Sequence, residues 1–166
     1  MDNIKGYYLM PHPPILVEEI GKEYLSEIKQ TYNGCCRIAE EISEIRPKTI
    51  VIITPHGQVF DDAIAVYMEE NAYGDLGHFG YDNININKKY NIKLSQDIID
   101  GCKEEGIHVV QIDNDSADMY DIYCEIDHGT FVPLYFIEKY YKDYNIVQIN
   151  YGFMNKFELY KAGMII

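Results

Sequence analysis

Three of the five histidines lie beside proline or glycine, each at the end of a predicted strand or the start of a predicted helix. They are His12 in the segment PHPP, His56 in TPHG and His128 in DHGT. Imidazole is the commonest metal ligand among side chains, and its pKa near neutrality also suits acid–base chemistry. One such histidine alone is more simply satisfied by a backbone hydrogen bond, but two Pro-His segments after consecutive predicted strands favour ligation. The pattern predicts that these histidines form the core of a metal site.

His128 has two candidate roles in such a site, a third ligand or a general base. It begins a predicted helix, where the macrodipole favours the neutral imidazole. Asp127 beside it could orient the ring, although a helix cap is the simpler interpretation. His78 lies in the segment GDLGHFG, whose glycines permit close approach to a substrate. His108 opens a predicted strand and is expected to be structural or exposed.

Two carboxylates, Asp61 and Asp62, follow His56 closely in the sequence. Carboxylates often accept the second ring N–H of a ligating histidine, which fixes its orientation. They could equally be turn residues before the next strand. No P-loop, G-x-G-x-x-G or G-x-S-x-G motif is present, which disfavours nucleotide, dinucleotide and serine-hydrolase functions.

The elements that must position these histidines begin with a predicted βαβ unit. Short apolar runs at 6–10 and 49–54 are each stopped by proline and read as buried strands. Apolar residues at helical spacing fill 17–45 between them, with a break expected at Asn33-Gly34. A helical crossover implies parallel strands whose carboxyl ends share one sheet edge. We therefore expect His12 and His56 to face one another across adjacent strands.

The rest of the chain continues the alternation of helices and strands. Strands are expected at 63–68, 107–112 and 146–150, helices at 94–106, 130–141 and 157–164, and a long loop at 71–87. The predicted class is α/β, with a mostly parallel central sheet and helices on both faces.

Composition limits the class of protein further. A chain of 166 residues with 47% apolar residues suits one domain, and its formal charge of −13 would repel nucleic acid. The N-terminus has no secretory signal and no segment is long enough to span a membrane, so we expect a cytoplasmic protein with four reduced cysteines. The last predicted helix runs to Ile166 without a glycine stop or polar tail. Residues 1–166 are therefore expected to form a single, incomplete domain.

Three segments together resemble one enzyme family over nearly the whole chain. PHPP, ITPHG and DHGTFVPL are similar to motifs of the class III extradiol ring-cleavage dioxygenases, in their LigB-like catalytic subunit. The GDLGHFG segment looks closest to bacterial proteins of the AmmeMemoRadiSam group, which join such a domain to an AMMECR1 domain. The resemblance implies a LigB-like, phosphorylase-like three-layer sandwich that is truncated at its C-terminus.

The resemblance also implies roles for individual residues. His12 and His56 would hold iron(II) and His128 would be the acid/base, acting on a catechol-like aromatic and O2. Beside these, we expect His78, Gly57 and Pro13 on the substrate side. The family's third ligand is a glutamate beyond a further strand, which this chain does not reach. Either that carboxylate lies beyond Ile166, or Asp61, Asp75 or a water completes the shell.

Alternatives to ring cleavage remain open at this point. One is a metal-binding module without dioxygenase activity, like the Memo relatives that share the fold. Such a module would work with an AMMECR1-type or radical-SAM partner. Another is a zinc-dependent hydrolase that uses the same histidines, and zinc or no metal could replace iron. A second copy of the chain is a further candidate partner.

Overall fold

The computed structural model describes residues 4–122 and 124–166. The strands are β1 Thr49–Thr54, β2 Ile64–Tyr67, β3 Asn71–Leu76, β4 Tyr81–Lys89, β5 Val109–Ile112 and β6 Asn145–Asn150. The α-helices are α1 Glu18–Gly21, α2 Lys29–Ile45, α3 Ile92–Glu104, α4 Asn114–Tyr120, α5 His128–Glu138 and α6 Lys156–Ile165. Short 3-10 turns are η1 Pro14–Leu16, η2 Lys22–Ser26 and η3 Gly77–Phe79.

The central sheet has four strands in the order β1-β6-β2-β5. β1 runs parallel to β6 from Thr49↔Asn145 to Thr54↔Asn150, and β2 runs parallel to β5. The contact between β2 and β6 is antiparallel. The mostly parallel sheet is therefore confirmed, and the carboxyl ends of β1 and β6 lie at one edge.

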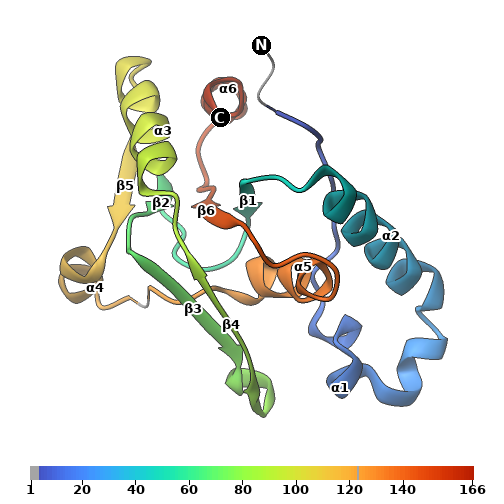
Figure 1. Ribbon diagram of the computed structural model, residues 1–166. Coiled ribbons are helices and arrows are strands. Elements are labelled where there is room, and N and C mark those ends of the chain that lie inside the picture. Colours follow the sequence, from blue (N-terminus) through green and yellow to red (C-terminus); the bar gives the residue numbers. More distant parts are fainter. Residues whose placement is uncertain (1–3, 123) are drawn as a thin grey trace.

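Two hydrophobic cores, one on each face of this sheet, make the fold three-layered (Figure 1). Alternate residues of a strand point to opposite faces. Ile64 and Val66 of β2 pack in the core of α3 and α6, whereas Ala65 and Tyr67 pack in the core of α2 and α5. Because all four residues are buried, β2 reads as a continuous apolar run, which is typical of a strand covered on both faces.

The segment 6–10 is not a strand, which corrects the predicted βαβ unit. Tyr7 and Leu9 are 86% and 94% exposed, and within the described residues the segment pairs with no strand. An apolar run forms a strand only where a neighbouring strand accepts its hydrogen bonds. His12 therefore reaches the sheet edge from an extended segment and not from a strand adjacent to β1.

The predicted loop at 71–87 is instead the hairpin of β3 and β4, paired from Asn71↔Lys89 to Asp75↔Asn85. Ala72 and Leu76 of β3 are buried, as is Ile86 of β4, while most of the asparagines are exposed. The hairpin forms because one face of it packs on the core.

The helical region 17–45 is interrupted earlier than predicted. The break falls in η2, after Lys22 adopts a left-handed φ of 44°, and α2 runs unbroken through Asn33 and Gly34. α4 was not expected from the sequence. None of the helices in residues 4–122 and 124–166 has the length and apolarity needed to cross a membrane.

Candidate metal centre

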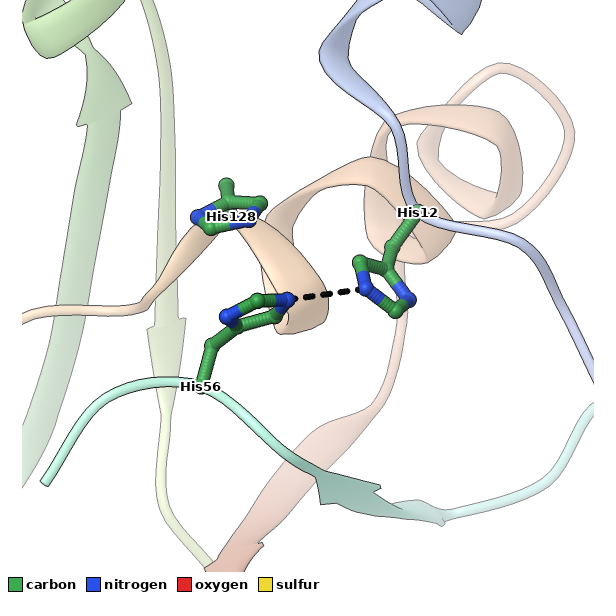
Figure 2. A group of neighbouring side chains, drawn as sticks. All are labelled: His12, His56 and His128. Atoms are coloured by element: carbon green, nitrogen blue, oxygen red, sulfur yellow. Dashed lines mark hydrogen bonds between the residues drawn. The ribbon is translucent and has the colours of Figure 1, made fainter. Parts of the chain in front are cut away.

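His12, His56 and His128 converge at the carboxyl edge of β1 (Figure 2). Each of the three histidines has a ring nitrogen that lies within 4.8 Å of a ring nitrogen of the other two. The Nε2 atoms of His12 and His56 are 2.9 Å apart. The rings of His56 and His128 have centroids 4.0 Å apart, and those of His12 and His128 are 6.0 Å apart. Three separate segments therefore bring their imidazoles to one point.

His12 is held in place by the segment that follows it. Pro13 precedes η1, and the Leu16 amide donates to the Pro13 carbonyl at 3.0 Å. Leu16 and Val17 are fully buried, so they anchor this segment in the core beside α5. The anchor replaces the strand pairing that the sequence had suggested.

His56 is positioned by a tight turn at the end of β1. Its backbone amide donates to Thr54 Oγ1 at 3.2 Å. Gly57 follows with φ of +76°, and a Cβ at this position would lie 2.2 Å from Asn150 Nδ2. The turn therefore requires glycine at residue 57, for conformational and steric reasons together.

His128 is the first residue of α5, and Asp127 caps that helix. The Asp127 carboxylate accepts the Gly129 and Thr130 amides at 2.7 and 3.2 Å, which confirms the simpler interpretation of this residue. A Cβ on Gly129 would lie 2.3 Å from Thr54 Oγ1 and 2.9 Å from His56 Cδ2. Only glycine lets α5 approach the end of β1 so closely.

A polar network beneath the histidines was not identified from the sequence. Thr54 Oγ1, Thr130 Oγ1 and Gln148 Nε2 donate to the Asp127 carboxylate at 3.0 to 3.1 Å, and all three donor residues are buried. Buried polar groups need such partners. The sequence contains one sign of this network, because the polar Gln148 interrupts the apolar run of β6. Nothing in the sequence indicates that Asp127 is the partner of Gln148.

Burial lowers the pKa of His12 and of His128, and the nearby His56 lowers both further. Asp127 opposes this effect by raising the pKa of each. Both histidines are therefore biased toward the neutral imidazole, which is the form that binds a metal or accepts a proton.

The donor set fits a transition-metal ion. Two nitrogens that are each about 2.1 Å from an ion and at right angles lie about 3 Å apart, close to the 2.9 Å between His12 and His56. Imidazole suits iron, zinc and copper alike, so these atoms do not select the metal. Within the described residues, the group of side chains that could hold a metal ion at this edge consists of the three histidines, and no carboxylate belongs to it.

Among the described residues, none of the other histidines and aspartates considered in the sequence belongs to the cluster. His78 is exposed in η3, and its neighbour Phe79 places its ring edge-on to His128 with centroids 5.6 Å apart. Asp62 is exposed, and its Oδ2 lies 3.7 Å from Nδ1 of His108, which is exposed as expected. Asp75 accepts the Gly77 amide at 2.7 Å in the turn that follows β3. Asp61 and Pro13 are exposed.

The fold and the site together define an α/β domain that gathers three histidines at the carboxyl edge of its sheet. Residues 6–166 match the family described as the catalytic LigB subunit of aromatic ring-opening dioxygenase, and the chain belongs to this family. The resemblance of the three histidine segments to the LigB-like catalytic subunit is thereby confirmed.

One curated relative is Protein CA_C1420 of Clostridium acetobutylicum. It is 40% identical over 162 residues, which cover 98% of this chain and 35% of that protein. The chain thus spans about a third of the length of the curated relative it matches.

Proposed function

We propose that the chain is the metal-holding and acid–base part of an extradiol dioxygenase, which opens the ring of a catechol-like substrate with O2. The observation that carries this proposal is the convergence of His12, His56 and His128 within 4.8 Å of one another. Membership of a family of aromatic ring-opening dioxygenases supports the same class of reaction, with a small aromatic substrate and O2.

His12 and His56 are the metal ligands in this proposal. Their Nε2 atoms lie 2.9 Å apart, and the lowered pKa of His12 favours the free lone pair that ligation requires. Members of this family typically use non-haem iron. Iron(II), when bound, would supply the electron transfer to dioxygen that imidazoles cannot provide.

His128 is the proton-transfer residue. It takes a hydroxyl proton from the catechol and returns a proton to the ring-opened product. Its lowered pKa keeps it neutral and able to accept that proton at neutral pH. Phe79 beside it offers an aromatic edge to a flat substrate. His78, Gly57 and Pro13 are assigned to the substrate side of the same site.

The carboxylate that completes the ligand set in this family is proposed to lie beyond Ile166. No carboxylate within residues 4–122 and 124–166 joins the cluster, and the curated relative is almost three times as long as this chain. Two histidines without a carboxylate would hold iron(II) weakly.

The test begins with metal content. After the full natural protein is loaded anaerobically with iron(II) and desalted, we expect it to keep its metal by elemental analysis and the variants His12→Ala and His56→Ala to lose it. His108→Ala, an exposed histidine outside the cluster, should keep it. Metal retained by both cluster variants would contradict the assignment of ligands.

The second arm measures ring opening in the full natural protein with iron(II). We expect a yellow ring-opened product and matching oxygen uptake from at least one catechol. His128→Gln should retain iron but lose at least about a hundredfold in turnover, the usual contribution of a general acid–base residue. Loss of metal in this variant would make His128 a ligand instead.

A second candidate function is a metal-binding module without ring cleavage, working with an AMMECR1-type domain. The absence of a carboxylate from the described cluster favours it. Stoichiometric metal in the full natural protein, together with no oxygen uptake across a broad panel of catechols, would support this function over the first.

A further inference from the structure

A hollow lies at the opposite end of the sheet from the histidines. It is an open cavity of about 700 Å³, bordered by Lys48 before β1, Lys89 at the end of β4 and Asn145 at the start of β6. His56 follows the other end of β1. A strand of six residues spans about 20 Å, so the hollow and the histidine cluster are separate sites.

The charge of this hollow differs from that of the rest of the molecule. Five of the chain's 14 Lys and Arg line it, against one of its 27 Asp and Glu. The five cations are Arg46, Lys48, Lys88, Lys89 and Lys142. We call this hollow the basic pocket. In a chain with a formal charge of −13, a hollow whose charged side chains are mainly positive favours the binding of an anion.

Two of the five cations have carboxylate partners. The buried Lys88 ammonium lies 2.6 Å from Glu138, so it is part of the fold. Lys89 lies 3.9 Å from Glu70, and both side chains are largely exposed, which makes the pair weak. Across residues 4–122 and 124–166, Arg46, Lys48 and Lys142 have no ion pair within 4.0 Å. Three exposed positive charges therefore border one hollow without a carboxylate partner among the described residues.

Arg46 is also held in an unusual backbone conformation. It follows α2 with φ of 51° and ψ of 59°, a left-handed geometry that glycine adopts without strain. Its guanidinium lies 5.8 Å from the centre of the Tyr141 ring, which fixes it at the pocket rim. A cation at the end of a helix is favourable in itself. That effect could account for Arg46, but not for Lys48 and Lys89, which lie next to strands.

We propose that the basic pocket binds a small molecule through a diphosphate or triphosphate group. The Arg46 guanidinium can donate two parallel hydrogen bonds to phosphate oxygens, and Lys48 and Lys142 supply compact positive charges beside it. Asn71, Asn87 and Asn145 also line the pocket, and their side-chain amides are a further source of donors. A nucleic acid polymer is disfavoured, because the strongly acidic chain would repel its extended backbone.

The test uses inorganic pyrophosphate as the probe and titration calorimetry on the metal-free chain at low ionic strength. We expect saturable binding at one site, weakened by added salt. His12→Ala should bind equally well, which separates this pocket from the histidine cluster. No saturable binding at millimolar pyrophosphate would overturn the proposal. Equal or tighter binding of citrate would also overturn it, because the site would then be one for carboxylates.

Arg46→Gly is the decisive variant, since glycine suits the left-handed backbone at this position. We expect an affinity at least about tenfold weaker, with an unfolding midpoint that is unchanged or higher. Lys48→Gln, a change at an exposed residue, should also weaken binding. The matched control is Arg37→Gln, an exposed change in α2 that removes the same charge and should leave the affinity unchanged.

Two further outcomes would contradict the proposal. An equal loss of affinity in Arg37→Gln would show that pyrophosphate binding depends only on the net charge of the chain. Binding of an acidic peptide in place of pyrophosphate would make the basic pocket a docking surface for an acidic protein segment.

Discussion

The positions of His56 and His128 depend on Gly129 and Asp127, which join the first turn of α5 to the end of β1. Gly129 leaves the space that Thr54 and the His56 ring occupy, and Asp127 ties the two elements together through part-buried hydrogen bonds. Neither residue belongs to the histidine cluster. Both should nevertheless affect metal binding, because ligand geometry is set by the groups that hold the ligands.

Gly129→Ala should therefore displace His56. The added methyl would meet Thr54 Oγ1 at 2.3 Å, in a region where buried backbone cannot easily shift. We expect about 1–3 kcal/mol of destabilisation, typical of overpacking, and a lower metal content. Gly34→Ala is the control, since a Cβ there meets nothing within 4 Å and α2 should gain up to about 1 kcal/mol. Urea unfolding and elemental analysis measure both effects, and equal stability of the two variants would refute the packing argument.

Asp127→Ala should be more harmful than the loss of an ordinary helix cap. Removing a cap costs about 0.5–2 kcal/mol, and each buried donor left unpaired costs about 1–3 kcal/mol more. Asn155 caps α6 in the same way, through the Phe157 and Glu158 amides, but at an exposed site. Asn155→Ala therefore measures the cap together with one exposed hydrogen bond, from Asn155 Nδ2 to Glu158 Oε2. If urea unfolding gives the same loss for both variants, the buried network contributes nothing.

At the element scale, the sequence predicted those helices and strands whose first and last residues are marked by local residue types. The run 49–54 is β-branched and ends at Pro55, so β1 was predicted with its bounds, and with it the place of His56. Asparagine is rare in strands, and this bias concealed the alternation of Ile84 and Ile86 that makes β4 half of a hairpin. Composition alone could not show that 6–10 lacks a neighbouring strand.

The contributions of segment 6–10 and of η1 to stability can be compared by replacing one leucine in each with alanine. Leu9 is 94% exposed and Leu16 is 1% exposed, although the sequence assigned the first to a buried strand. Leu9→Ala should change stability by no more than about 0.5 kcal/mol, whereas Leu16→Ala should cost about 2–5 kcal/mol. Leu16→Ala should also weaken metal binding, because it loosens the anchor of His12. A large loss of stability in Leu9→Ala would restore the predicted strand.

At the scale of the whole molecule, opposite ends of one sheet carry different chemistry. The carboxyl edge gathers three histidines near Asp127, and the amino ends of β1 and β6 border the basic pocket. The histidine cluster could be predicted because each member lies in a short motif at an element boundary. The basic pocket could not, since its cations come from the α2–β1 connection, β4 and the α5–β6 connection and meet only in the folded chain.

Burial of the histidine cluster predicts how the stability of the metal-free chain depends on pH. The pKa values of His12 and His128 are lowered from 6.5 by burial and by His56. Well above pH 6.5 both histidines are neutral in the folded and the unfolded chain, and they add no pH dependence. As the pH falls below this value, the unfolded chain binds protons that the folded chain does not, so stability decreases until the folded-state pKa values are passed.

Urea unfolding of metal-free chain at a series of pH values from neutral to mildly acidic measures this loss. The double variant His12→Gln with His128→Gln should lose less stability over the same range, because glutamine binds no proton. Saturating zinc, which competes with protons for the same nitrogens, should stabilise the chain at neutral pH and progressively less as the solution becomes acidic. An unchanged pH dependence in the double variant would show that the two histidines are solvated in the folded chain, and would remove the electrostatic basis for a neutral metal-binding cluster.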